Sequence, residues 1–503
     1  MAFTILSQKI LLRILLFNLL FWFPLLSGCA VNPATKRTEF MIVSEEQEFR
    51  IGQSVDKEVR EEMGVYLELP ELRSLVKEVG ETIGRNSDRP NLIYRIEVVD
   101  SPDFNAFVLP GGFIYVHRGL LEKINSVDEL ASVVGHEISH VAARHSAAQI
   151  SKAQLMNIGL IGLTVATKGA IQDYGDLINL GAALAFNKFS RDDEREADYF
   201  GTKYLIRSGY NPNASFAVMK HIQTLEIREP ALLETWFMTH PSTSERLVNL
   251  NQAIEEVRLS QPQTLNLPVK RNQYIALLDG LAVGEWNGNE LISGERYYNK
   301  EFLLSLTIPE GWQAHINSKK YTAVFAQPKK EFYVFFDIEP LRIQKTTEEY
   351  FRDFEKRLHQ LGLSKVKGLT SHRGLRHGAL TGIYTGYDRN RGSITAEGIA
   401  FVGGTNGYTL VGSSRDADFK EFQPLVESML ASFQFISQPE ASELKPSRLR
   451  IHEVKPGETW ATITQTYFHS SEGKAKLAEY NGFEVSQGLT AGILLKIPPS
   501  LRL

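Results

Sequence analysis

The chain is organised around the stretch Val133-Val134-Gly135-His136-Glu137-Ile138-Ser139-His140-Val141. If this stretch is helical, its two histidines lie on one face about one turn apart, so both imidazoles can reach a single metal ion. Glu137 would then stand where a general base can take a proton from a water molecule that the metal activates. The spacing alone leaves a metal site and a surface pair equally open. The apolar neighbours predict a buried helix, in which these polar groups would be destabilising without a partner, and therefore favour a metal.

An acidic run further along the chain offers the remaining ligands. Ser190-Arg191-Asp192-Asp193-Glu194-Arg195-Glu196-Ala197-Asp198 is predicted to begin a helix. Glu194 and Asp198 face the same way, one nearer the metal and one behind it, whereas Glu196 points elsewhere. A solvated acidic face is the usual explanation of such a run. Because a catalytic zinc site needs three protein ligands and one open position, the histidine pair favours a ligand role for this run.

Length and composition place the chain among ordinary globular proteins. Its 503 residues are 43% hydrophobic and 23% charged, with a formal net charge of -4. A length of this order predicts about two to four domains and an ample core. The balanced charge predicts no nucleic-acid partner.

The amino terminus has the features of an export signal. The apolar run Ile14 to Leu26 is long enough for a signal peptide and too short for a confident membrane span. It ends in Leu26-Ser27-Gly28-Cys29, and because Cys29 is the only cysteine it cannot form an internal disulfide. This stretch resembles a bacterial lipoprotein lipobox, which implies cleavage after residue 28, lipidation of Cys29 and, with Ala30 following, anchoring at the outer membrane. A plain signal or an uncleaved anchor is the alternative.

The segment before the histidine helix is predicted to be helical and then extended. Ser44 to Gly84 has the pattern of two helices that are broken near Leu69-Pro70. Strands are predicted at Asn91 to Val99, at Asn105 to Gly112 and at Phe113 to Val116. The last two form a hairpin, whose edge could pair with an extended peptide or could be purely structural. The residues proposed for this substrate-binding edge are Asn105, Ala106 and Phe107.

The histidine helix is predicted to run from Val127 to about Ile150. On a continuous helix His145 lies about two and a half turns from His136, on the opposite face, so its role is expected to be structural. The apolar stretches Ile158 to Ala166 and Leu177 to Phe186 follow. Both are too short and too broken for a transmembrane pair, and they predict a packed or mobile flap over the site.

The combined motifs carry a family resemblance. His136-Glu137-x-x-His140 with Ser190-Arg191-x-x-Glu194-x-x-x-Asp198 resembles the zinc metallopeptidase family of the CAAX prenyl protease and bacterial HtpX. The lipobox and the Asn105 to Gly112 stretch resemble its soluble periplasmic, BepA-like branch. The resemblance covers about residues 40 to 258. It implies a mainly helical zincin-type (gluzincin) catalytic domain with a small β-hairpin or sheet, one zinc ion and protein or peptide substrates.

The resemblance also implies a role for each motif residue. His136, His140 and Glu194 would be the zinc ligands, and Glu137 the general base. Asp198 would orient a ligand histidine through a hydrogen bond, as the partners of metal ligands commonly do.

A further motif lies downstream, at Met238-Thr239-His240-Pro241. It matches a family motif whose histidine lies near the metal. His240 would then stabilise the oxyanion, or would occupy the open zinc position and keep the enzyme latent. The sequence does not choose between these roles, and a single His-Pro in a loop is more often structural.

The carboxyl-terminal half contains no catalytic constellation. Strands are predicted at Phe302 to Ile308, Ala323 to Gln327, Phe332 to Ile338, Gly382 to Tyr387, Ser393 to Val402 and Gly407 to Gly412, with helices at Thr347 to Leu361 and Phe419 to Ala431. This is the pattern of an α+β sandwich. It weakly resembles small α/β/α modules of the PsbP kind, which implies binding or docking, and a structural appendage is equally open.

The last segment, from Ile451-His452-Glu453-Val454-Lys455-Pro456-Gly457-Glu458-Thr459-Trp460 onward, fits the order strand, helix, helix, strand. It resembles a LysM module, which implies binding to N-acetylglucosamine-containing glycan such as peptidoglycan. Glu458 and Trp460 stand where an aspartate and a leucine are usual, a departure that bears on glycan affinity rather than on the fold. A small domain that merely packs on its neighbours is the alternative.

Together these features predict an α+β multidomain protein. Its predicted parts are a signal peptide (1–28), a tether (29–43), a metallopeptidase domain (44–259), a linker region (260–294), an α+β sandwich (295–437), a second linker (438–450) and a βααβ LysM-like module (451–500).

The leading functional hypothesis is a lipid-anchored periplasmic zinc endopeptidase that cleaves misfolded or stalled envelope proteins. The alternative is a chaperone-like protein that grips client chains at the Asn105 edge while His240 keeps the zinc latent. The two hypotheses differ in whether Glu137→Gln abolishes function. Trimming of peptidoglycan peptides is a third hypothesis, favoured only by the LysM-like module.

Overall fold

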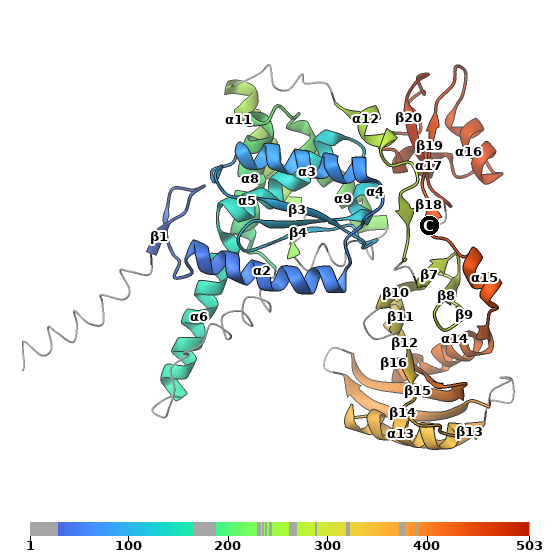
Figure 1. The fold of residues 1–503 in the computed structure, drawn as a ribbon. Coiled ribbons are helices and arrows are strands. Elements are labelled where there is room, and N and C mark those ends of the chain that lie inside the picture. Colours follow the sequence, from blue (N-terminus) through green and yellow to red (C-terminus); the bar gives the residue numbers. More distant parts are fainter. Residues whose placement is uncertain are drawn as a thin grey trace, which may run out of the picture. The chain divides into compact units, whose positions relative to one another are not determined.

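The structure, a computed structural model, describes residues 29–164, 188–228, 244–260, 269–286, 289–317, 322–371, 378–388 and 391–501, together with 233, 236, 239 and 240. The chain divides into two units (Figure 1). The first contains the residues up to Val99, Asp103–Asp279 and the residues from Arg450 onward, and the second consists of Asp100–Pro102 and Gly280–Leu449. Helices and several sheets occur in both units, so the fold is mixed α and β.

The amino-terminal segment of the first unit is not the free tether that the sequence predicted for residues 29–43. Strands β1 (Cys29–Val31) and β2 (Thr38–Phe40) pair as an antiparallel hairpin. Asn32 is fully buried and donates a hydrogen bond to the carbonyl of Ala143 at 2.9 Å. Met41 and Val43 are also buried, in one cluster with residues that follow the histidine helix. The segment packs because it has apolar side chains to bury. The predicted signal peptide, residues 1–28, lies outside the described residues.

A small sheet forms the centre of the first unit. Its strands β3 (Arg95–Val99), β4 (Ala106–Leu109) and β5 (Phe113–His117) have the order β3-β5-β4, with β3 parallel and β4 antiparallel to β5. Helix α2 (Glu45–Glu62) packs on one face, and α3 (Pro70–Arg85) lies on the other, as Figure 1 shows. The predicted helix pair and hairpin are therefore confirmed.

Local sequence sets the start of these helices. Ser44 and Gln47 form a capping box at the start of α2, so two backbone donors at that helix end are satisfied. Pro70 occupies the first turn of α3, where its missing N–H removes no helical hydrogen bond.

The histidine helix is shorter than predicted. After α4 (Arg118–Lys123), helix α5 runs over Val127–Ala142, and a separate helix, α6, begins at His145 and covers His145–Thr164. Between them Arg144 has a φ of 56°, which a continuous helix does not allow. The prediction of one helix from Val127 to Ile150 is therefore wrong. Helical propensity and periodicity continue through this break, and the side chains that hold it come from distant parts of the chain.

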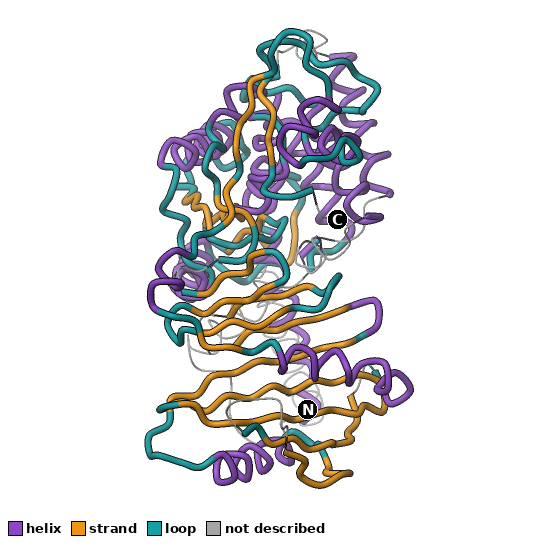
Figure 2. Tube along the Cα trace, turned by 90° about the vertical axis from the view of Figure 1, so that its right-hand side faces the viewer, coloured by secondary structure: helices purple, strands orange, loops and turns teal. Residues whose placement is uncertain are grey.

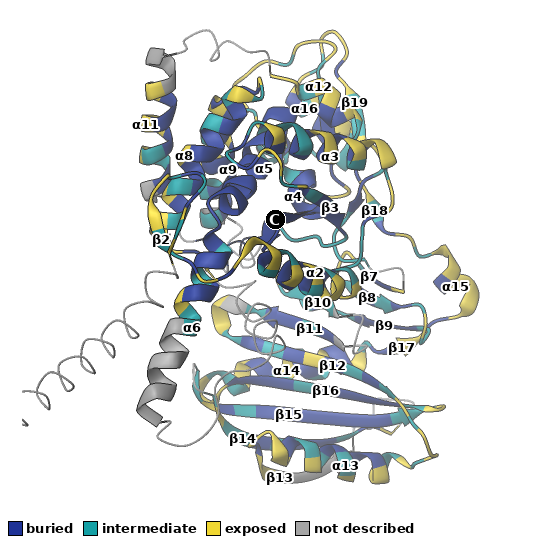
Figure 3. Ribbon diagram, turned by 60° about the vertical axis from the view of Figure 1, so that its left-hand side comes forward, coloured by how far each residue is buried: buried dark blue, intermediate teal, exposed yellow. Residues whose placement is uncertain are grey.

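Helix α8 (Arg191–Arg207) crosses α5 at two glycines. A Cβ atom on Gly201 would lie 3.1 Å from the backbone nitrogen of His136, and one on Gly135 would lie 2.6 Å from Leu205 Cδ1. The glycines therefore allow the backbones of the two helices to approach closely. Helix α5 is buried over almost its whole length, as Figure 3 shows.

The first unit is completed by α9 (Asn213–Arg228), α11 (Ser244–Ser260) and α12 (Arg271–Ala276). Most of the predicted flap, residues 165–187, lies outside the described residues. Among the residues that the structure does describe, no helix is both long and apolar enough to cross a bilayer.

The second unit is built on a seven-stranded antiparallel sheet, which Figure 2 shows together with its helices. Its order is β10-β11-β12-β16-β15-β14-β13. Alternate residues of β15 face opposite sides: Ile399 and Phe401 join the core under α14, and Ala396 and Ala400 join the core under α13. The two helices therefore cover opposite faces. The bounds in this sheet are β10 (Gln313–Asn317), β11 (Thr322–Gln327), β12 (Phe332–Pro340), β13 (Ser364–Ser371), β14 (Leu380–Asp388), β15 (Gly392–Gly403), β16 (Asn406–Arg415), α13 (Thr347–Gln360) and α14 (Phe419–Ala431).

A second sheet of this unit has the order β17-β9-β8-β7. Its strands are β7 (Glu290–Ser293), β8 (Arg296–Asn299), β9 (Leu304–Thr307) and β17 (Gln434–Phe435). The α+β pattern and every strand and helix predicted between residues 302 and 431 are found, whereas β7, β8, β10 and β13 were not predicted.

Both predicted linkers contain secondary structure. Residues 260–294 include α12, β6 (Ala282–Val283) and β7, and residues 438–450 include α15 (Gln438–Glu443) and β18 (Ser447–Arg448), which pairs with β6. The sequence prediction was wrong here because short strands carry too few residues for a detectable period.

The carboxyl-terminal residues of the first unit have the predicted order strand, helix, helix, strand. Strand β19 (Arg450–Glu453) pairs antiparallel with β20 (Leu494–Ile497), and α16 (Trp460–Phe468) and α17 (Lys474–Tyr480) lie between them in the chain. The buried Lys496 donates from Nζ to the carbonyls of three residues at the end of α4: Glu122 (2.7 Å), Lys123 (3.0 Å) and Ile124 (3.0 Å). This module therefore packs on the part of the unit that precedes the histidine helix.

Candidate active site

Four side chains converge between α5 and α8. His136 and His140 lie one turn apart on α5, and their Nε2 atoms are 3.1 Å from each other. Glu194, in the first turn of α8, places carboxylate oxygens 3.5 Å from His136 Nε2 and 3.6 Å from His140 Nε2. His240 Nδ1 donates to Glu194 at 2.9 Å. One ligand atom from each of these residues lies within 4.8 Å of all the others, and all four residues are buried.

The donor atoms in this cluster suit a metal ion. Two imidazole nitrogens that face each other at 3.1 Å can share at most one proton, so a cation beside Glu194 fits better than a hydrogen bond alone. Two histidines and a carboxylate form one of the usual ligand sets of catalytic metal sites. The residues present therefore fit a metal ion.

Glu137 lies beside the cluster in a strongly desolvated position. It is fully buried, and neither of its carboxylate oxygens has a hydrogen-bond partner. Burial raises the pKa of Glu137 above its usual range. The nearest imidazole is that of His240, whose Nε2 lies 3.4 Å from Glu137 Oε1. Glu137 can accordingly take up a proton more readily than an exposed glutamate.

Asp198 contacts Nδ1 of His136, on the side of the ring that faces away from the cluster, which is the contact that the family resemblance implies. Its Oδ1 lies 3.0 Å from His136 Nδ1. Arg246, from α11, donates to both oxygens of Asp198 at 2.7 and 2.8 Å and lies 2.9 Å from Glu194. Burial opposes ionisation of Asp198, but Arg246 and His136 outweigh it and hold the pKa of Asp198 below its usual range.

The surroundings of the two histidines on α5 shift their pKa values in opposite directions. Burial opposes protonation of His136, but hydrogen bonds to Asp198 and Glu194 outweigh it and raise the pKa of His136 to about 9. Burial, together with the charge on His136, lowers the pKa of His140 well below the usual value. Of these two rings, His136 is therefore the one whose protonated form its surroundings favour.

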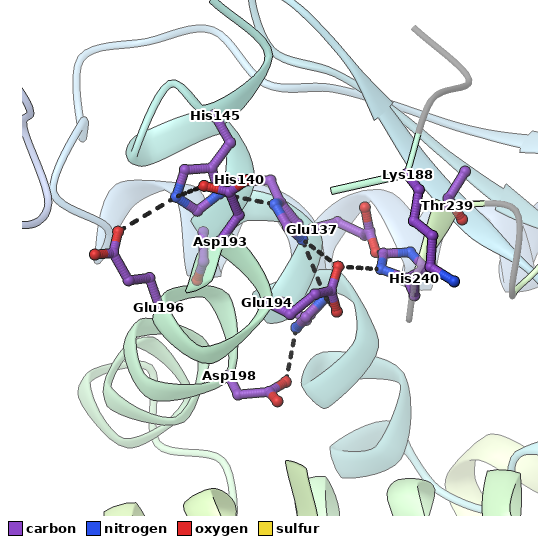
Figure 4. A network of polar contacts seen from close by, with 12 residues as sticks. Glu137, His140, His145, Lys188, Asp193, Glu194, Glu196, Asp198, Thr239 and His240 are labelled. Carbon is purple, nitrogen blue, oxygen red and sulfur yellow. Dashed lines mark hydrogen bonds and ion pairs between the residues drawn. The ribbon is translucent and has the colours of Figure 1, made fainter. Parts of the chain in front are cut away.

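Sequence reasoning missed Arg246 and misplaced His145. Arg246 follows His240 by six residues, and its own segment has no motif that indicates a role at the site. His145 was expected on the far face of a continuous helix, but the break at Arg144 brings its Nδ1 to 2.8 Å from Nδ1 of His140. Figure 4 shows the three side chains His140, His145 and Glu196 in line. Glu196 does point away from the metal cluster, as predicted.

The remaining predicted site residues lie elsewhere. The predicted substrate-binding edge is buried at the start of β4, at Asn105, Ala106 and Phe107. Among the described residues β4 is an edge strand of its sheet, and it lies alongside α5. The Phe107 ring stacks on Tyr115 at a centroid distance of 4.9 Å. Cys29 is exposed at the start of β1. Met238 and Pro241 lie outside the described residues.

These features define a class of protein: one with a buried cluster of two helix-borne histidines and a carboxylate that could hold a metal ion, next to a glutamate without hydrogen-bond partners. Comparison with known proteins then gives the family. Residues 69–254 match the family described as peptidase family M48.

Two relatives agree with this match. The mitochondrial metalloendopeptidase OMA1 of Schizosaccharomyces pombe is 30% identical over 234 residues, which are 46% of this chain and 67% of the yeast protein. The β-barrel assembly-enhancing protease of Escherichia coli is 26% identical over 201 residues, which are 38% of this chain and 40% of that protein. The chain therefore belongs to peptidase family M48, and its relatives in these comparisons are metalloproteases.

A solved structure also resembles part of the chain. Cyanobacterial PsbP from Synechocystis sp. PCC 6803 aligns with 30% of this chain and 98% of its own length, at 13% identity and a TM-score of 0.23. A score this low supports no conclusion about the second unit.

Proposed function

We propose that this chain is a zinc-dependent endopeptidase in which His136, His140 and Glu194 hold the metal. The observation that carries the proposal is the buried cluster itself, with ligand atoms within 4.8 Å of one another and Glu137, whose carboxylate makes no hydrogen bond, beside it. Zinc is the ion most often bound by this combination of imidazoles and carboxylate in hydrolases.

The side chains around the cluster can carry out peptide hydrolysis. A bound zinc ion would supply Lewis acidity, which polarises a carbonyl and lowers the pKa of water. Glu137 accepts the proton of the attacking water and later passes it to the leaving amine, a task that its raised pKa suits. Asp198 orients the ring of His136 through Nδ1. Because Nδ1 of His240 donates to Glu194, its Nε2, 3.4 Å from Glu137, could donate to the developing oxyanion only in the imidazolium form.

The proposed substrates are misfolded or stalled proteins of the bacterial envelope. The support is the lipobox-like stretch that ends at Cys29, together with the E. coli relative, which is named for β-barrel assembly. We place the protein in the periplasm, anchored by lipid on Cys29 at the outer membrane, with the LysM-like module near peptidoglycan. β4 would offer its edge to an extended substrate. Incorporation of labelled palmitate by wild type, with none by Cys29→Ala, tests the anchor.

The peptidase proposal is tested by incubating purified mature protein with unfolded casein. We expect wild type to cleave casein, with loss of cleavage on chelation and recovery with zinc. Glu137→Gln should keep its zinc and lose about a hundredfold or more in rate, because proton transfer is lost while the ligands remain. Glu81→Gln, on the exposed surface of α3, is the matched control and should behave as wild type. Cleavage by Glu137→Gln at the wild-type rate would contradict the proposal.

A latent, chaperone-like site is the second candidate, and one observation favours it. His240 belongs to the same cluster as the three ligands, and a fourth protein ligand would close the position that a catalytic metal needs. In that case wild type binds unfolded casein without cutting it, and His240→Ala gains cleavage. If His240→Ala instead loses activity, His240 acts in the reaction.

A further inference from the structure

A second histidine stands behind one of the proposed zinc ligands. His145 Nδ1 lies 2.8 Å from Nδ1 of His140. On its other side, His145 Nε2 lies 3.4 Å from Glu196 and 3.9 Å from Asp193. His145 is buried, and its two ring nitrogens both have partners. The line from His140 through His145 to Glu196 is visible in Figure 4.

This geometry allows only one arrangement of protons if His140 binds the metal. The Nε2 atom of His140 faces the cluster, so it must be free of a proton in order to act as a ligand. The proton of neutral His140 then lies on Nδ1 and is donated to His145 Nδ1. His145 must accept there, so its own proton lies on Nε2 and points toward Glu196. The carboxylate can only accept, which fixes the direction of both hydrogen bonds.

We propose that His145 is a positioning residue that fixes the tautomer and ring orientation of the zinc ligand His140, with Glu196 as the acceptor that orients His145. The inference rests on the proposed zinc site. His145 would then contact Nδ1 of His140 in the same position as Asp198 contacts Nδ1 of His136. The residues that act as partners of metal ligands commonly set ligand basicity as well as orientation.

The break between α5 and α6 lies directly before His145, where the chain must turn for His145 to face His140. On a continuous helix a residue five positions after His140 points about 140° away from it around the axis. The turn at Ala143 and Arg144, where Arg144 has a φ of 56°, brings His145 back to face His140.

Side chains from the amino-terminal part of the chain hold this turn. Arg144 donates to Glu48 at 3.0 Å and to the carbonyl of Val43 at 2.8 Å, and Asn32 donates to the carbonyl of Ala143 at 2.9 Å. Left-handed backbone at a non-glycine residue is strained, so it persists only where neighbouring contacts enforce it. The segment directly after Cys29 therefore helps to place His145.

The test measures zinc affinity rather than activity. Metal-free full-length protein competes with a chromophoric chelator for zinc, in wild type, His145→Ala, His145→Asn and Glu196→Gln. Losing a partner of this kind weakens metal binding by about 10- to 100-fold, and this is the result expected for His145→Ala. His145→Asn should recover most of the affinity, because its amide oxygen can lie where Nδ1 lies and can accept from His140. The zinc affinity of Glu196→Gln should lie between that of His145→Asn and that of wild type.

A matched histidine serves as the control. His452, in the carboxyl-terminal module, also lies between a carboxylate and a second partner, Glu458 at 2.8 Å and Tyr467 at 3.1 Å. His452→Ala should leave the zinc affinity unchanged. The absorption spectrum of cobalt-substituted protein gives a second readout, and we expect the visible bands to shift in His145→Ala and to return toward wild type in His145→Asn.

The outcomes separate this inference from the proposed function. If wild type and His145→Ala bind zinc equally well and their cobalt spectra coincide, His145 is not a positioning residue, although the zinc site stands. If the Ala and Asn variants lose affinity equally, the acceptor role is wrong. If wild type itself binds no zinc, the ligand assignment fails, and this inference fails with it. Should His145→Ala not fold, the comparison of His145→Asn with Glu196→Gln and wild type decides.

Discussion

The two proposed zinc-binding histidines are supported in different ways. His136 meets a carboxylate directly, and that carboxylate, Asp198, is gripped at both oxygens by Arg246, with all three residues buried. His140 meets a second imidazole, His145, and only then a carboxylate, Glu196, whose side chain is 27% exposed.

The difference teaches how one buried site can present two ligands of different charge. The direct ion pair lets His136 hold a proton, and its pKa is raised to about 9 even though burial opposes this. His140 has no carboxylate at its Nδ1, and burial together with the charge of His136 holds the pKa of His140 well below the usual value. On this account zinc binding would have to compete with a proton at His136, whereas Nε2 of His140 would be free to bind without such competition.

The largest effect is expected from removing Arg246. Arg246→Met would leave the carboxylates of Asp198 and Glu194 buried without their cation, and breaking a buried pair in this way costs about 3–5 kcal/mol. We expect that loss in the free energy of unfolding of the metal-free protein, measured by urea denaturation. Arg60→Met, which removes a partly exposed arginine paired with Asp56, should cost less than about 1 kcal/mol. Equal losses in the two variants would contradict the account.

The next largest effect is the part of the pH dependence of the unfolding free energy that comes from His136. The pKa of His136 rises from 6.5 to about 9 on folding, so its stabilising contribution is complete below pH 6.5 and is lost as the pH rises through 9. The loss should be on the order of 3 kcal/mol in the metal-free protein. The difference in urea stability between wild type and His136→Gln, followed from pH 6 to 10, measures it. A difference that does not change with pH would show that His136 holds no proton.

A smaller loss of unfolding free energy is expected from removing His145, the partner of His140. His145→Ala removes one neutral hydrogen bond to His140 and one to a partly exposed carboxylate, which costs about 1–3 kcal/mol in the metal-free protein. This loss should stay below that of Arg246→Met under the same conditions. The reverse order would mean that the neutral support stabilises the fold more than the ionic one.

The smallest effect, a change in zinc affinity, is expected from substituting Glu196, which contacts His145 on the side away from His140. Glu196 forms an ion pair at 3.7 Å with Arg37, whose side chain is 78% exposed, so this end is screened by salt. Glu196→Gln should weaken zinc binding only a few-fold, about 0.5 kcal/mol, and less at 1 M than at 0.05 M salt. Asp198→Asn, at a buried carboxylate, should show no such salt dependence. Zinc competition at the two salt concentrations compares the variants.

The sequence was sufficient for the parts of the site that depend on spacing along one helix. Two histidines four residues apart, and Glu194 four residues before Asp198, fall on one face whatever the rest of the chain does. The order of elements around them was equally predictable, because helix and strand periods are local.

The parts that failed depend on contacts between distant residues. His145 was misplaced because the break at Arg144 is held by Asn32, Val43 and Glu48, about a hundred residues earlier. Arg246 was missed because nothing in its own helix shows that it faces buried carboxylates. The amino-terminal hairpin was taken for a tether because a short polar segment gives no sign of what it packs against.

The measurement that tests the central claim most directly is a stoichiometric zinc titration of metal-free protein, with casein cleavage followed at each point. The account predicts that wild type regains activity in proportion to zinc and saturates at about one ion per chain. It predicts that Glu137→Gln takes up the same amount of zinc without regaining cleavage, and that His136→Ala takes up little. Full cleavage by metal-free wild type, or by Glu137→Gln loaded with zinc, would contradict the account.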